Sequence, residues 1–388
     1  MGDADTIIRN KWVIRSSNSN GNSSSSKWSE HVPDDIMQSI LQRLCILHYV
    51  RCGSVCRSWR DSVVRARCRP APELPWLFSP SRRTFLRYNS EQKIYKLNLP
   101  TDDEYDAYVG SIEGWLMRVD WTGSIITLLN PISGGRVMLP RCKHEVTAPF
   151  IRKVVASSVP TTRSPSCTVV ACLSTGVENT TLAVCRPTDK SWTRIDEGLS
   201  FEDIQFIDEK LYAATKNPSK FLIVFQFDTN NHDHHQQIQY RAKRLVVLDD
   251  PGPDRERFEH IFTIKKSGLF LATDLSTSKE LLMITFPDNY IEELLVFPPN
   301  YADAFQVFKL EFNNNAAATN GSPPPPPRWV EIVGFRDRIL FLCQRCNEFN
   351  DATYADTNDL HDIYLRHCII SGLGLFSLRT FWFTPNPW

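Results

Sequence analysis

The sequence predicts a small all-α segment followed by an all-β domain, a β-propeller of about six or seven blades. Two observations carry this prediction. Between Pro33 and Arg67 the apolar residues recur at helical spacing, and the only glycine is Gly53. After a proline-rich stretch at 70–75, short β-rich runs follow one another to the end of the chain, separated by Gly, Pro, Asn and Asp. Helices therefore come first and strands afterwards, in two separate domains.

The first segment of the chain is expected to be a disordered leader over residues 1–27. Its stretch SSNSNGNSSSSK is polar and of low complexity, so it cannot bury enough apolar surface to offset the entropy lost on ordering. Order is expected to begin near Trp28.

Two helical patterns follow, and together they predict a helical domain over residues 28–69. Pro33 suits the first helical position, and two aspartates after it suit the positive end of the helix dipole. The apolar residues of this first helix form one stripe with a second stripe beside it: Ile36, Ile40 and Leu44, then Met37 and Leu41. A later helix is predicted to place Val55, Trp59 and Val63 on one line, four residues apart. The prolines at 70–75 end this region, because each lacks a donor N–H and restricts the residue before it.

Residues 76–388 are predicted to form the β domain. Radial repetition of four-stranded blades lets an all-β domain of this length grow without long exposed edges. Two polar insertions, near 230–237 and 313–327, are predicted to be loops between strands. The expected strands are SIITLLN, KVVAS, CTVVACL, TLAVCRP, DIQFI, KLYAAT, FLIVFQF, RLVVLD, GLFLAT, LLMITF, FQVFKLEF, RILFLC, DIYLRHCII and GLGLFSL.

The charge balance and the cysteine content indicate which partners and which cellular compartment to expect. The formal net charge is zero, from 44 basic and 44 acidic residues, so bulk electrostatics predict neither a nucleic-acid partner nor a membrane partner. The 11 cysteines and the absence of a signal-like or membrane-spanning run favour a reduced, intracellular protein of the cytoplasm or nucleus.

Several patterns could carry chemistry, but each has a more ordinary interpretation. No phosphate loop, nucleophile elbow, dinucleotide fingerprint or zinc-protease helix is present, so no catalytic, cofactor or metal residue is predicted. Carboxylates could pair as in propeller glycosidases, although nothing in the sequence brings any two together. The features considered are Cys45, Cys52, Cys56 and Cys68 as metal ligands, the CxxC pair Cys343 and Cys346, the loop residues His232, Asp233, His234 and His235, the polyproline run Pro323 to Pro327, the basic run Arg57, Arg60, Arg65, Arg67 and Arg69, and the acids Asp203, Glu209, Asp250 and Glu292.

The segment VPDDIMQSILQRLCILHYVRCGSVCRSWRDSV resembles an F-box, with a Val-Pro start, an amphipathic first helix and a closing Val-Cys-Arg-x-Trp-Arg helix. It departs from that pattern in CILHYVRCG, which leaves the start of the second helix open. Downstream, GWLM, ITLLNPISGGRVMLP, LAVCRPTDKSWTRID and FEDIQFIDEKLYAAT resemble the large plant family that joins an F-box to a kelch-like propeller.

This resemblance implies a non-catalytic substrate receptor of a Skp–cullin–F-box ubiquitin ligase. The F-box would bind the Skp adaptor and through it the cullin, and the propeller would bind an unknown protein target without any cofactor. Carried over to this sequence, the adaptor-binding residues would be Val32, Pro33, Ile36, Ile40, Leu41, Leu44, Val55 and Trp59. The alternative is a stand-alone propeller interaction module that takes no part in ubiquitination.

Overall fold

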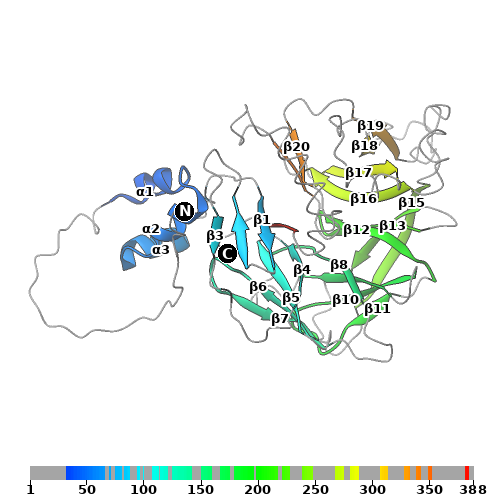
Figure 1. The fold of residues 1–388 in the computed structure, drawn as a ribbon, viewed down its shortest axis with the longest axis horizontal. Coiled ribbons are helices and arrows are strands. Elements are labelled where there is room, and N and C mark those ends of the chain that lie inside the picture. Colours follow the sequence, from blue (N-terminus) through cyan, green and yellow to red (C-terminus); the bar gives the residue numbers. More distant parts are fainter. Residues whose placement is uncertain are drawn as a thin grey trace, which may run out of the picture.

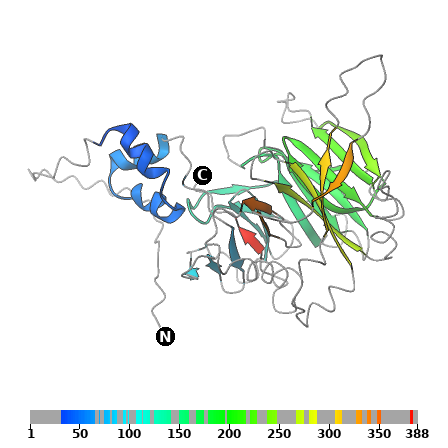
Figure 2. The same cartoon turned by 90° about the horizontal axis from the view of Figure 1, so that it is seen from above.

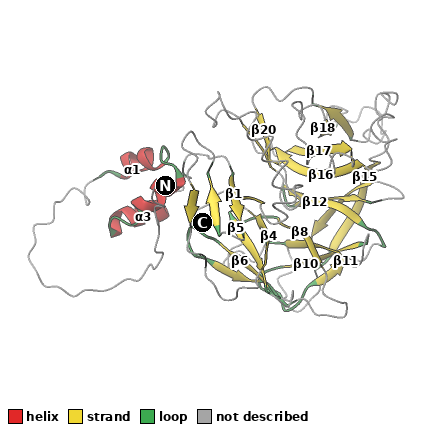
Figure 3. Cartoon of the chain, in the orientation of Figure 1, coloured by secondary structure: helices red, strands yellow, loops and turns green. Residues whose placement is uncertain are grey.

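The architecture comes from a computed structural model, in which three helices precede a succession of β-strands (Figure 1). Helices and strands occupy separate parts of the chain (Figure 3). The structure describes residues 32–65, 70, 75–80, 83–87, 94–96, 99, 107–112, 114–120, 125–141, 150–159, 167–174, 179–195, 198–216, 221–227, 238–247, 267–274, 280–287, 306–312, 327–332, 338–341, 348–351 and 381–383.

The helices are α1 (Asp34–Leu41), α2 (Ile46–Cys52) and α3 (Arg57–Arg65). Pro33 lies one position earlier than the sequence predicts. Its ψ of 144° is extended, so it precedes the helix, while its carbonyl accepts the first helical hydrogen bond from the Met37 N–H at 3.0 Å. The two aspartates of the first turn are exposed, where they favour the positive end of the helix dipole.

The predicted line through Val55, Trp59 and Val63 is wrong at its first member. Cys56 precedes α3, and its carbonyl accepts the Arg60 N–H at 3.0 Å, so the helix begins at Arg57 and Val55 lies in the turn before it. Val55 is therefore 60% exposed, whereas Val63 is buried. The sequence interval of four residues places two side chains on one face only when both residues are helical.

The described strands form five sheets, in which neighbouring strands are antiparallel except for one pair. Four of the sheets have four strands each, in these spatial orders: β22 (Phe381–Phe383), β1 (Trp76–Ser79), β2 (Thr84–Leu86), β3 (Ile94–Lys96); β4 (Ala107–Ile112), β5 (Trp115–Val119), β6 (Ile126–Leu129), β7 (Arg136–Met138); β8 (Phe150–Ala156), β9 (Val169–Ser174), β10 (Thr180–Cys185), β11 (Thr193–Ile195); and β12 (Phe201–Ile207), β13 (Lys210–Thr215), β14 (Phe221–Phe227), β15 (Tyr240–Val247). The fifth has the order β19 (Arg328–Glu331), β18 (Gln306–Glu311), β17 (Glu280–Pro287), β16 (Ser267–Asp274), β21 (Glu348–Asp351), β20 (Arg338–Phe341), in which β21 pairs with β16 in parallel.

The sheets are arranged radially, as in a propeller. One strand of each sheet contacts one strand of the next, in the series β22, β4, β8, β12 and β16. We call these the inner strands. The C-terminal strand β22 pairs with β1, so the two ends of the β domain share one sheet, as Figure 2 shows for the red strand. This antiparallel propeller fold is the predicted one. The blade number of six or seven stays a prediction, because much of 288–380 lies outside the described residues.

Twelve of the fourteen predicted strands coincide with described strands, while DIYLRHCII and GLGLFSL lie outside the described residues. Several strands were missed by the sequence reasoning, and most of these have only three or four residues, as in β3, β7 and β22. A run of that length is too short to show the alternation that marks a strand. The insertion near 230–237 lies outside the described residues, but it connects paired strands, since Phe227 of β14 faces Tyr240 of β15.

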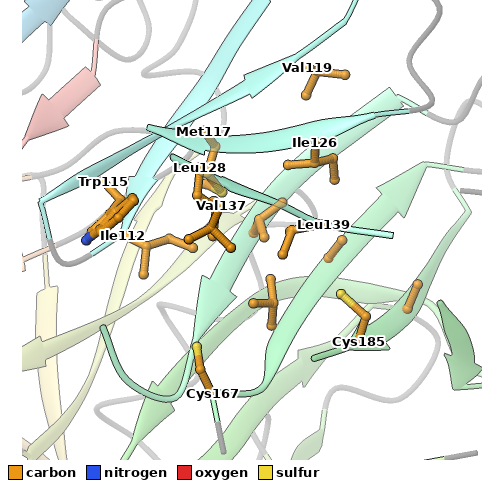
Figure 4. Packing of buried hydrophobic residues seen from close by; sticks show 14 of the residues in the cluster. Ile112, Trp115, Met117, Val119, Ile126, Leu128, Val137, Leu139, Cys167 and Cys185 are labelled. Carbon is orange, nitrogen blue, oxygen red and sulfur yellow. The ribbon is translucent and has the colours of Figure 1, made fainter. Parts of the chain in front are cut away.

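Apolar cores fill the spaces between successive sheets. Figure 4 shows the core between the second and third sheets, which includes Trp115, Met117 and Leu128. Asn130, fully buried after β6, closes the turn into β7: its Oδ1 accepts the N–H groups of Ile132 and Ser133, each at 2.9 Å. This local hydrogen bonding is the reason that asparagine favours such turns.

A buried ion pair joins three of the inner strands. Lys153 Nζ of β8 lies 2.8 Å from Oδ1 of Asp203 on β12, and both side chains are only 4% exposed. The Leu271 N–H of β16 donates to Oδ2 of the same carboxylate at 2.7 Å, and the N–H of Ile204 donates to Oδ1 at 2.8 Å. Buried charges need such complete pairing, so this group fixes β8, β12 and β16 relative to one another.

Candidate functional site on the three helices

The three helices pack around a very small core. Met37 and Leu41 of α1, Tyr49 of α2 and Val63 of α3 are its buried members. Polar contacts complete the packing of α2 on α3, because Tyr49 Oη donates to the Val63 carbonyl at 3.1 Å and Arg60 Nε donates to the Gly53 carbonyl at 3.2 Å. The unit has few residues with which to bury its apolar surface, as expected for so short a segment.

One cysteine stands directly before α2 and another stands directly before α3. Cys45 is the residue before α2, and its Sγ lies 3.3 Å from Nδ1 of His48. Cys56 is the residue before α3, and its Sγ accepts the Trp59 N–H at 3.5 Å, so it occupies the position of a helix cap. Burial raises the pKa of the Cys52 thiol at the end of α2. These cysteines lie at helix ends, and Cys68 lies outside the described residues.

Three apolar side chains project from this unit into solvent. Ile36 and Ile40 are 50% and 45% exposed, and they lie one helical turn apart on the same side of α1. Val55 projects from the turn between α2 and α3. We call these three residues the apolar surface. Exposed large aliphatic side chains on so small a unit are typical of surfaces that bind a partner.

The other predicted adaptor-binding residues differ from one another in their burial. Val32, Leu44 and Trp59 are half-buried and pack against the small core, and Pro33 is exposed. Leu41 differs from the rest, since it is 0% exposed and forms part of the core. Any contribution of Leu41 to binding must therefore act through the shape of α1. The Trp59 indole N–H is enclosed and has no hydrogen-bond partner in the described part of the chain.

The other sequence features do not form a site within the described residues. Asp203 is held by Lys153, and Glu209 is exposed in the turn between β12 and β13 with a positive φ of 63°. Among the described residues, no group of three or more His, Cys, Asp and Glu side chains is placed to hold a metal ion. Of the basic run, Arg57 is exposed and Arg60 donates to the Gly53 carbonyl, while Arg67 and Arg69 lie outside the described residues. Also outside them are Asp250, Glu292, the histidine loop, Cys343 and Cys346, and prolines 323–326.

Comparison with known proteins identifies both parts of the chain. An F-box domain model matches residues 30–69, and the KIB1-4 beta-propeller model matches residues 77–359. The molecule is thus an F-box protein with a propeller, and the chain belongs to the KIB1-4 beta-propeller family. F-box domains in general bind the Skp adaptor, and F-box proteins are generally non-catalytic subunits of ubiquitin ligases.

The curated relatives are plant proteins. Two F-box/kelch-repeat proteins of Arabidopsis thaliana are each 28% identical, over 37% and 48% of this chain and 38% and 51% of their own lengths. The chain thus matches about half or less of each. A putative F-box protein of the same plant is 27% identical over 64% of this chain and 68% of its own length.

Among solved structures, a GH43 glycoside hydrolase engineered for endo-xylanase and exo-arabinofuranosidase activity is 12% identical, with 67% of this chain and 54% of that chain covered and a TM-score of 0.24. A score so low carries no argument about this chain.

Within the described residues, no helix combines the length and the apolar character needed to cross a membrane.

Proposed function

We propose that this chain is the non-catalytic, target-binding subunit of a Skp–cullin–F-box ubiquitin ligase of the cytoplasm or nucleus. In this proposal residues 28–69 bind the Skp adaptor and residues 76–388 bind a protein target. The observation that carries it is the exposure of Ile36, Ile40 and Val55 on a helical unit whose own core is already filled.

The exposure of these residues supports one of the two functions that the sequence left open. A helical unit that served only its own propeller would bury its apolar stripe against the strands. Ile36, Ile40 and Val55 instead retain about half of their surface or more. Burying the exposed half of one such side chain stabilises a complex by about 1 kcal/mol. A binding partner therefore gains from covering the surface, and this favours the receptor over the stand-alone module.

The edges of the surface support the same proposal. Val32, Leu44 and Trp59 are partly buried and pack against the small core, so the exposed residues belong to a unit whose helices are held together from within. Arg43, Arg51 and Arg57 are exposed on the same unit, and polar and charged residues of this kind commonly accompany an apolar binding surface.

The test is capture of a purified plant Skp adaptor by the full chain. We expect Ile36→Asp combined with Ile40→Asp to reduce capture by at least tenfold, because each change places a charge where the adaptor would bury a methyl-rich side chain. Both residues are exposed in the free chain, so the helices should remain folded. Far-UV circular dichroism checks the fold.

The matched control is Gln38→Asp combined with Ser39→Asp, which adds the same charge to exposed positions of α1. This control should capture the adaptor as the parent does. Equal capture by the isoleucine variant and the parent would show that the apolar surface is not the adaptor site. Failure of the parent chain itself to bind any Skp adaptor would overturn the receptor proposal and leave the stand-alone module.

A further inference from the structure

One edge of the propeller differs from the others in length. In the four-stranded sheets the outer strand lies at the opposite end of the sheet from the inner strand, and the fifth sheet ends in β19 and β20. The outer strands β3, β7 and β11 have three residues each and the end strands β19 and β20 have four each, whereas β15 has eight. An outer strand presents unpaired N–H and C=O groups, and proteins usually keep such strands very short. The length of β15 is therefore the exception among the described outer strands.

The side chains of β15 give this edge a basic character. Its sequence YRAKRLVV contains no acidic residue, and Arg241, Lys243 and Arg244 are all exposed. Arg241 and Lys243 lie two residues apart and so share one face of the sheet. Neither forms an ion pair in the part of the chain that the structure describes. The chain as a whole is neutral, so this concentration of positive charge is local.

The strand is held firmly in place. Arg244 lies over the ring of Phe221, with its guanidinium carbon 4.5 Å from the ring centroid. Tyr240 packs against Phe225 and Phe227 at centroid distances of 5.9 Å and 6.4 Å. Leu245 packs into the core between the fourth and fifth sheets. A preformed edge loses little entropy when it gains a further strand.

We propose that β15 binds an acidic, extended segment of a protein partner, which adds to the sheet as a further strand. Backbone hydrogen bonds to the edge would supply affinity, and alternate acidic side chains facing Arg241 and Lys243 would supply specificity. Basic side chains on an edge also discourage self-association, and the two roles are compatible. This inference goes beyond adaptor binding, and it holds equally for a module outside any ligase.

A nucleic acid could also be attracted by positive charge. It would meet the side chains of β15, but its backbone cannot continue the ladder of a sheet edge. A peptide uses both features of this strand, the charges and the edge that no other described strand pairs with, and these two features favour a protein segment.

The test uses the full chain and a labelled eight-residue peptide in which glutamate alternates with valine, with fluorescence anisotropy as the readout. Three comparison ligands are measured in parallel: the same peptide with glutamine for glutamate, the same peptide with N-methylated backbone amides, and a single-stranded oligonucleotide. We expect the glutamate peptide to bind at least tenfold more tightly than any of the three. Binding of the N-methylated peptide or the oligonucleotide as tight as that of the glutamate peptide would overturn strand addition, and no binding of the glutamate peptide would overturn the proposal altogether.

The protein variant is Arg241→Glu combined with Lys243→Glu, which keeps the edge charged but reverses its sign. We expect about a tenfold or greater loss of peptide binding without aggregation, since two favourable cross-strand pairs become repulsive. The control, Arg141→Glu combined with Lys190→Glu, makes the same charge change at exposed positions outside the sheet that contains β15, and it should bind as the parent does. Equal weakening in both variants would point to bulk charge and overturn the assignment to β15. Adaptor capture should be unchanged in all of them, which keeps this test separate from that of the proposed ligase function.

Discussion

Replacing either member of the buried Lys153–Asp203 pair should destabilise the β domain strongly. Lys153→Met leaves the Asp203 carboxylate buried, but two backbone donors still hold it, at 2.7 Å from Leu271 and 2.8 Å from Ile204. Asp203→Leu leaves a buried ammonium together with those two unpaired N–H groups. Removing one partner of a buried pair costs about 3–5 kcal/mol. We expect Lys153→Met near the lower end of that range and Asp203→Leu near the upper end.

The double variant distinguishes pairing from simple packing. Lys153→Met with Asp203→Leu removes both charges, so its loss should fall well below the sum of the two single losses. The assay is urea denaturation of the full chain followed by far-UV circular dichroism, with the free energy of unfolding taken from the midpoint and slope.

A control with the same chemical change is available at the surface. Lys309 lies 2.7 Å from Glu280 with about a third of its side chain exposed, so Lys309→Met should cost about 1 kcal/mol or less. If Lys153→Met cost no more than this control, or if the single losses simply added, the inference that one ion pair fixes three inner strands would be wrong.

Two further predictions concern the β domain. Asn130→Ala should lower the free energy of unfolding by about 1–3 kcal/mol, because two backbone donors lose their acceptor. The control Ser133→Ala removes an exposed hydroxyl of the same turn and should cost far less. Equal losses in the two variants would refute the role of Asn130. Burial, with a smaller effect of the Asp203 carboxylate, raises the pKa of Cys172 from 9.0 to about 12. The folded chain then keeps a proton that the unfolded chain loses. Above pH 9.0 the free energy of unfolding should therefore fall more steeply in the parent than in Cys172→Ala, by about 1.4 kcal/mol per pH unit. Parallel pH profiles of the two chains would contradict this.

Sequence reasoning identified the helical domain because its signals are local. A proline before two acids, apolar stripes at helical spacing and the Val-Cys-Arg-x-Trp-Arg ending all lie within one short segment. It could not tell which apolar residues face outward. Ile40 and Leu41 are neighbours in the sequence, yet one is 45% exposed and the other is 0% exposed. The direction of each stripe is decided by where α2 and α3 pack against α1.

The sequence by itself determined the two-part organisation, the change from helices to strands and the longer strands of the β domain, because periodicity and turn residues act over a few positions. Only the tertiary structure decided which distant groups meet. Asp203 is 50 residues from Lys153 and 68 from Leu271 along the chain, and the strand order of the sheets brings the three together. The pairing of β22 with β1, and the place of β15 at the end of its sheet among the described strands, arise in the same way, since backbone hydrogen bonds between strands carry no pattern that a single sequence displays.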